Sequence, residues 1–147
     1  IYSQNGKLIS KGFFAFDKNF RGGVHIAVGD IDQDGKGEIM VTPACGLAPT
    51  VKIFSEQGKA LGSFLAYDKN FKGGVNVSFG DIDGDGKKEI ITGPNAGGPH
   101  VRIFSVAGQL LSQFMAFDAS GRTGVRVSVS DIDGDGKAEI LAGTANF

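Results

Sequence analysis

Short runs of apolar residues recur along the whole chain, and glycine-containing turns separate them. In one such run Val24, Ile26 and Val28 alternate with other residues, which is the two-residue period of a β-strand. The runs are rich in Val, Ile and Phe, and each is too short for a stable helix. The pattern therefore predicts a chain of short antiparallel strands without helices.

The strand pattern repeats with a fixed period. The acidic strings GDIDQDGKGEI, GDIDGDGKKEI and SDIDGDGKAEI place Asp30, Asp81 and Asp131 at intervals of 51 and 50 residues. The flanking string VKIFS likewise returns as VRIFS. A period of about 50 residues is typical of repeat architectures, and four short strands per period indicate the blades of a β-propeller. WD-type repeats are shorter and carry Trp, which this chain lacks, whereas kelch repeats share the period but do not explain the acidic strings.

The composition narrows the class of protein further. Glycine is frequent, with 24 of 147 residues, and the net charge is only −1. The single cysteine gives no disulfide framework, and no apolar run is long enough to span a membrane, so we expect no membrane insertion. Lysine and arginine are spread without a stripe, which argues against a nucleic-acid partner. The chain starts with neither Met nor a leader segment, as a processed or trimmed sequence would.

Acidic residues, in contrast, are concentrated. Twelve of the 16 Asp and Glu residues lie in the three repeated strings, at positions 1, 3, 5 and 9 of the pattern D-x-D-x-D-G-x-x-E. Alternate carboxylates in a tight turn converge on one point, and hard oxygen ligands of this kind suit Ca²⁺. An EF-hand would require a Glu at position 12 and flanking helices, Mg²⁺ prefers a strict octahedron with retained waters, and Zn²⁺ prefers His and Cys.

The sequence thus predicts one Ca²⁺ per acidic string and three per chain. The lysine at position 7 of each string is expected to offer its backbone carbonyl. The predicted ligands are Asp30, Asp32, Asp34, Lys36 and Glu38; Asp81, Asp83, Asp85, Lys87 and Glu89; and Asp131, Asp133, Asp135, Lys137 and Glu139.

The strings GDIDGDGKKEIITGP and GGPHVRIFS resemble the FG-GAP and VCBS repeats that form the propeller blades of integrin α-subunits. Phe79-Gly80 and Thr92-Gly93-Pro94 are the nearest fits to the family lettering. The resemblance implies an all-β propeller with a calcium loop between the first and second strands of each blade. It also implies a non-enzymatic scaffold or recognition module of the adhesion type, extracellular or at the cell surface, with a protein or glycan ligand.

This resemblance divides residues 1–147, taken as a single repeat domain, into blades. Residues 24–73 and 74–123 are expected to form complete blades, while 1–23 and 124–147 each supply half of a shared blade. Expected inner strands are 24–30, 75–81 and 125–131; second strands are 38–42, 89–92 and 139–143; third strands are 1–3, 51–55 and 101–105; outer strands are 8–16, 60–67 and 110–117.

About three blades do not close a ring, because propellers have about four to eight. We therefore expect a homodimer of six blades, in which each half blade is completed by the other subunit. A fragment of a longer propeller, and a designed or recently amplified repeat protein without a natural ligand, are the alternatives.

Two further features concern ligands and catalysis. His25, Asn76 and Arg126 occupy one register of the expected inner strands yet differ in chemistry, which makes them candidate ligand-binding residues. The alternative function is a hydrolase or lyase, or a fragment of one. Its acids outside the repeated strings would be Glu56 and three aspartates that each follow an aromatic residue before a turn, and that regularity favours turn capping over catalysis. The three are Asp17, Asp68 and Asp118.

Overall fold

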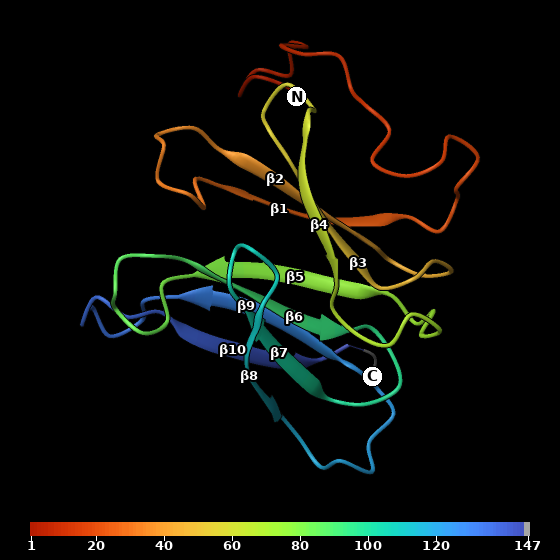
Figure 1. The fold of residues 1–147 in the computed structure, drawn as a ribbon, viewed down its shortest axis with the longest axis vertical. Coiled ribbons are helices and arrows are strands. Elements are labelled where there is room, and N and C mark those ends of the chain that lie inside the picture. Colours follow the sequence, from red (N-terminus) through yellow and green to blue (C-terminus); the bar gives the residue numbers. More distant parts are fainter. Residues whose placement is uncertain (146–147) are drawn as a thin grey trace.

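The computed structural model describes residues 1–145, and its regular elements there are all β-strands (Figure 1). No helix long and apolar enough to cross a membrane occurs among these residues. The strands are β1 (Val24–Gly29), β2 (Glu38–Pro43), β3 (Thr50–Phe54), β4 (Ala60–Leu65), β5 (Val75–Gly80), β6 (Glu89–Pro94), β7 (His100–Phe104), β8 (Leu110–Met115), β9 (Val125–Ser130) and β10 (Glu139–Thr144).

The strands form three antiparallel sheets in which sequence neighbours pair. The first sheet has the order β1-β2-β3-β4, the second has the order β5-β6-β7-β8, and the third contains only β9 and β10. The first two sheets have the same strand register. Even the register shift between Ile53 and Phe54 in the first sheet has its equivalent, between Ile103 and Phe104, in the second. The prediction of an all-β chain with four-stranded antiparallel sheets is confirmed.

The sheets pack face to face in chain order, so that the inner strands β1, β5 and β9 lie next to one another (Figure 1). A core cluster between the first two sheets contains the fully buried side chains of Met40, Val51, Val75 and Ile90. A second cluster between the second sheet and β9 centres on Ile91. Each such side chain stabilises the packing by about 1.5–3 kcal/mol, so the blade-like stacking rests mainly on apolar burial.

Polar contacts fix the spacing between sheets. Thr42 donates a hydrogen bond from Oγ1 to the backbone oxygen of Val75, at 2.6 Å. Gly74, at the start of β5, has φ +84°, and a Cβ there would lie 1.8 Å from the backbone oxygen of Ala44. Backbone approaches this close exclude any side chain, so the glycine before the inner strand is a packing requirement.

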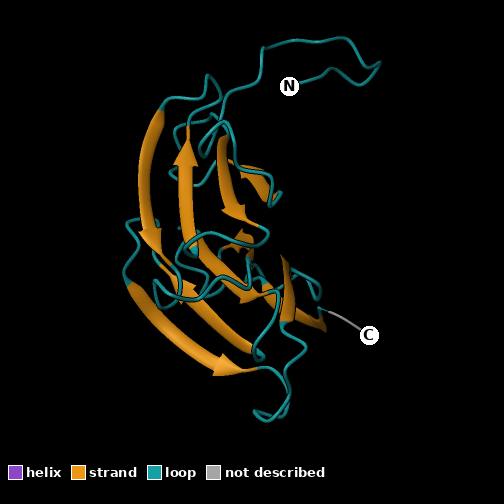
Figure 2. Cartoon of the chain, turned by 90° about the vertical axis from the view of Figure 1, so that its right-hand side faces the viewer, coloured by secondary structure: helices purple, strands orange, loops and turns teal. Residues whose placement is uncertain are grey.

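The strands expected at 1–3 and 8–16 do not form, and this part of the prediction is wrong for the chain as folded here. The segment is a loop that extends from the sheets (Figure 2), with one isolated bridge between Tyr2 and Leu8. A third strand needs a second strand beside it, and no described second strand is adjacent to this segment. A two-stranded hairpin alone is marginal in water, which explains the loss. The sheets consequently form an open arc rather than a closed ring, and the last two residues of the expected half blade 124–147 lie outside the described residues.

The three aspartates outside the acidic strings cap turns, as predicted. Asp17, Asp68 and Asp118 each accept a hydrogen bond at Oδ1 from the backbone N–H two residues later, at 2.8 Å in all three cases. This is the geometry of an Asx turn. It explains why the residue recurs at one point of each repeat.

Candidate metal centres in the acidic loops

Three acidic loops connect the first two strands of each sheet, over residues 30–38, 81–89 and 131–139. The loops lie on one side of the molecule, at the left of Figure 1. They also contact each other, because Ala138 donates its backbone N–H to the oxygen of Asp81 at 2.7 Å and Gln33 donates its side-chain amide to the oxygen of Gly86. The strand pairs thus hold the loops at fixed positions relative to one another.

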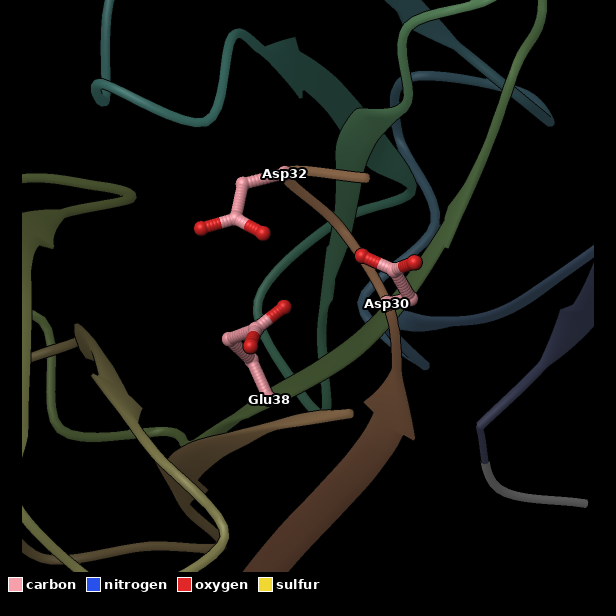
Figure 3. A group of neighbouring side chains, drawn as sticks. All are labelled: Asp30, Asp32 and Glu38. Atoms are coloured by element: carbon pink, nitrogen blue, oxygen red, sulfur yellow. The ribbon is translucent and has the colours of Figure 1, made fainter. Parts of the chain in front are cut away.

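Each loop brings three of its four acids together. Within each trio, one carboxylate oxygen from every residue lies within 4.8 Å of the others. In the first loop the carboxylates of Asp32 and Glu38 face one another, and Asp30 approaches from the side (Figure 3). The trios are Asp30, Asp32 and Glu38; Asp81, Asp83 and Asp85; and Asp131, Asp133 and Glu139.

The remaining predicted ligands lie beside these trios. Asp34 and Asp135 accept hydrogen bonds from the backbone N–H of the lysine two residues later, at 2.8 Å. In the second loop Asp85 accepts the corresponding bond from Lys87. In every loop the lysine at position 7 therefore donates its backbone N–H to the aspartate at position 5. These lysines are Lys36, Lys87 and Lys137. That their carbonyls bind metal stays a prediction.

Backbone hydrogen bonds hold the first and last acids of every loop in place. The first aspartate accepts the N–H of the glycine at position 6, at 3.0 Å in the first loop, 2.8 Å in the second and 3.1 Å in the third. The last glutamate accepts the N–H of the isoleucine at position 2, at 2.9, 3.1 and 2.9 Å. These bonds orient the carboxylates before any cation arrives, which lowers the ordering cost of binding.

The first loop differs from the other two at position 4. Gly84 and Gly134 each donate a backbone N–H to Oδ1 of the first aspartate, at 2.7 Å. Gln33 occupies this position in the first loop with φ +66°, and Oδ1 of Asp30 is buried without a hydrogen-bond partner. A buried carboxylate oxygen without a partner costs free energy, which a bound cation would recover.

The charges of the loops are poorly compensated by the protein itself. Burial raises the pKa of the Glu89 carboxyl, and the aspartates of the same loop raise this pKa further, against the N–H of Ile82, which lowers it. The backbone N–H of Lys87 lowers the pKa of the Asp85 carboxyl, and the exposed Lys87 ammonium, 3.1 Å from that carboxyl, lowers this pKa further. The lysines of the loops, one each in the first and third and two in the second, do not balance four acids. A cation is therefore electrostatically favoured at each trio.

The donor set fits a hard divalent cation. The three trios contain only carboxylates, without His or Cys. Oxygen donors in a tight, partly exposed loop match Ca²⁺ better than Zn²⁺, which requires nitrogen or sulfur ligands. The buried Asp30 oxygen without a hydrogen-bond partner is compatible with such an ion at the first loop.

The three candidate ligand-binding residues lie on β1, β5 and β9 and take different roles. Asn76 is buried, and its side chain joins three strands: Nδ2 donates to the oxygens of Gly93 at 2.8 Å and Val125 at 2.6 Å, while Oδ1 accepts the N–H of Val127 at 2.8 Å. Its amide is thus used inside the fold. Asn76 clamps neighbouring sheets together rather than presenting a free polar group.

His25 belongs to the same network, while Arg126 is exposed. Nε2 of His25 lies 2.9 Å from Nδ2 of Asn95, which also bonds the oxygen of Ala44. Burial lowers the pKa of His25, and the Arg126 guanidinium lowers it further, which favours the neutral ring whose unprotonated nitrogen can accept from Asn95. Asn95 was not among the predicted site residues. It lies in the loop after the second strand, within residues 94–100, whose sequence also differs between repeats, but its bonding role depends on contacts between sheets.

A comparison with known protein families finds a match for part of the chain. Residues 81–142 match the family model described as an FG-GAP-like repeat. The match includes the second and third acidic loops and the whole second sheet after β5. No curated protein and no solved structure matches the chain.

Proposed function

Since residues 81–142 form an FG-GAP-like repeat, we propose that the chain is a non-enzymatic recognition or scaffold module of propeller type, stabilised by calcium. One Ca²⁺ binds in each acidic loop, so the chain binds three ions. In the first loop Asp30, Asp32 and Glu38 hold the ion, and the corresponding trios hold the others. The ion supplies positive charge at each loop and, in the first loop, binds the Asp30 oxygen that the fold leaves without a partner.

The observation that carries this proposal is the threefold convergence of carboxylates together with the buried, unpartnered Oδ1 of Asp30. A single acidic turn would be unremarkable on a protein surface. Three loops in one register, each with its first and last acid already oriented by backbone N–H groups, favour a shared ligand over chance.

The metal acts as a structural element in this proposal. The loops join the inner strand to the second strand of each sheet. In the first and third loops the trio includes the first and the last acid, so an ion bound there ties those strands together. A ligand that binds only the folded chain adds about 2.7 kcal/mol of stability per site when its concentration is a hundred times Kd. The effect of chelation on unfolding should therefore be large.

Thermal unfolding in calcium and in EDTA tests the proposal. We expect a higher Tm in calcium, and we expect Asp30→Asn to reduce this difference while leaving the Tm in EDTA equal or higher, because the amide removes one repelling charge. Glu56→Gln is the matched control: Glu56 is an exposed acid outside the loops and should leave the difference unchanged. An identical Tm in calcium and in EDTA would refute a stabilising metal.

The recognition role is proposed for an extracellular or cell-surface setting, with a protein or glycan as ligand. The turn-capping roles of Asp17, Asp68 and Asp118 support a non-enzymatic function, since they commit most acids outside the loops to local structure. Arg126, exposed on β9, is the remaining candidate for ligand contact. An array of immobilised glycans, run beside a panel of chromogenic glycoside and ester substrates, separates the two classes: glycan binding without turnover supports recognition, and turnover contradicts it.

A further inference from the structure

The chain carries two half sheets at the opposite ends of its arc. At one end β9 and β10 pair exactly as β1 and β2 do, but no third strand follows along β10 among the described residues. At the other end lie residues 1–9, here called the N-terminal hairpin. They correspond to the turn that joins the third and outer strands, β3 and β4, in the first sheet. The two halves are therefore complementary parts of one four-stranded sheet.

The hydrogen bonds of the N-terminal hairpin match those of the turn between β3 and β4. Ser3 donates its backbone N–H to the oxygen of Lys7 at 2.9 Å, and Ser55 donates to the oxygen of Lys59 at the same distance in the turn between β3 and β4. The Tyr2–Leu8 bridge repeats the pairing of Phe54 with Ala60. The turn of the hairpin thus has the hydrogen-bond pattern of the complete sheets, although only one bridge flanks it.

The segment that follows, residues 13–20, is also placed as in a complete repeat. The rings of Phe13 and Phe54 have centroids 4.8 Å apart, as do those of Phe64 and Phe104 between the first and second sheets. Nζ of Lys52 donates to the oxygen of Ala15 at 2.8 Å, and Arg102 donates to Ala66 in the same way at 3.0 Å. Residues 13–20 therefore dock on the first sheet as the end of a preceding sheet would.

The outward faces of the two end sheets are apolar and exposed. Val24 is 46% exposed, whereas the equivalent Val75 and Val125 are fully buried. Leu141 on β10 is 44% exposed, whereas the equivalent Ile91 is fully buried against β9. The same sheet-to-sheet interface forms twice inside the chain. At each end of the arc, one of the two faces that make this interface remains uncovered.

We propose that a second copy of this chain covers both faces and completes both half sheets. The N-terminal hairpin of one copy adds to the edge of β10 of the other, and the Leu141 face packs on the Val24 face. The register follows from the complete sheets, where Ile91 pairs with Ile103 and Ile90 with Phe104. By equivalence, Leu141 lies opposite Ile1 of the second copy, and Ile140 lies opposite Tyr2.

The occupant is a second copy because the new contact continues an interface already present in the chain. The uncovered faces are the two halves of that interface, and the hairpin that fits β10 is part of this same sequence. Pairing of two copies satisfies both halves of the interface at once, because each copy offers one hairpin and one free β10 edge. The assembly also removes an exposed strand edge, which natural proteins avoid.

Light scattering at micromolar concentration tests the proposal in the chain as it stands. We expect twice the mass of one chain for the unmodified protein and a single-chain mass for Leu141→Arg, because the arginine would be buried unpaired at the junction. Leu111→Arg is the matched control, because Leu111 is a 51% exposed leucine on the outer strand β8, away from the junction. It should leave the mass doubled. A single-chain mass for the unmodified protein, an open series of larger species, or equal masses for both variants would overturn the proposal.

Disulfide trapping tests the register itself. In a Cys45→Ser background, the pair Ile1→Cys and Leu141→Cys should give a covalent dimer on mild oxidation, seen on a non-reducing gel. The control pair replaces the first site by Lys7→Cys, at the far end of the hairpin turn, and should stay uncrosslinked. Equal trapping by both pairs, or no trapping by the first, would contradict the register. The result does not depend on calcium binding, so failure here leaves the metal proposal standing.

Discussion

Replacing Gly74 by alanine tests whether the close approach between sheets is a requirement of the fold. Gly74 precedes β5 with φ +84°, and an added Cβ would lie 1.8 Å from the backbone oxygen of Ala44 and 2.4 Å from its carbonyl carbon. Backbone atoms cannot move aside as a flexible side chain can. The first and second sheets would have to separate by more than about 1 Å to restore an ordinary contact. A close-packed interior resists a shift of that size.

The magnitude follows from two contributions. Alanine in the left-handed region costs about 1 kcal/mol once the greater freedom of unfolded glycine is subtracted. Forcing the sheets apart adds about 2–3 kcal/mol, the upper range for overpacking. A total of about 3–4 kcal/mol lowers the Tm of a domain of this size by about 10–15 °C.

Gly23 provides the matched control. It stands at the same point before β1 with φ +72°, but its Cβ would only touch the Cβ of Ala44 at 3.5 Å. Gly23→Ala therefore carries the backbone strain alone and should lower the Tm by about 3–4 °C. Thermal unfolding followed by circular dichroism, with both variants in the same calcium buffer, gives the comparison. Equal losses for Gly74→Ala and Gly23→Ala would refute the packing argument.

Three further changes follow from the described contacts. Asn76→Ala leaves the N–H of Val127 without its partner inside the interface, so urea unfolding should show a loss of about 2–4 kcal/mol; a loss within 0.5 kcal/mol, roughly that of an exposed site, would contradict the clamp. Burial raises the pKa of Tyr67, so the folded state resists ionisation and loses stability above about pH 10, where the unfolded tyrosine ionises. Tyr67→Phe should reduce this alkaline loss in urea titrations, whereas Tyr2→Phe, at an exposed position, should not. Gln33→Gly relieves the positive φ of this residue but removes its side-chain bond to Gly86, so the stability in EDTA should stay within about 1 kcal/mol of the unmodified protein, and a clearly larger loss would contradict this balance.

The strands and the loops were predictable because both depend on local sequence. The two-residue alternation around Val24, Ile26 and Val28 places β1, and the glycines and aspartates of the repeated strings place the turn that follows. Equivalent residues in the later repeats gave β5 and β9 in the same way. Repetition makes such local signals stronger, because one register must satisfy every copy.

What the sequence did not reveal depends on contacts between repeats. Asn76 looked like a candidate ligand residue because its register holds a different chemistry in each repeat, yet its amide is used in joining β5, β6 and β9. The strand predicted at residues 1–3 was wrong for the described chain, because a strand forms only where a neighbour supplies hydrogen bonds. Which acids of a loop converge was likewise not readable from D-x-D-x-D-G-x-x-E, because the same pattern gives two different sets: Glu38 and Glu139 belong to their trios, whereas Asp85 takes that place in the second loop.

Isothermal titration of the chelator-treated chain with Ca²⁺ tests the central claim most directly. The three carboxylate trios predict saturable binding of three ions per chain, with the capacity falling by one in Asp30→Asn. No saturable heat up to millimolar Ca²⁺, or the same capacity in that variant, would contradict the assignment of the acidic loops as calcium sites.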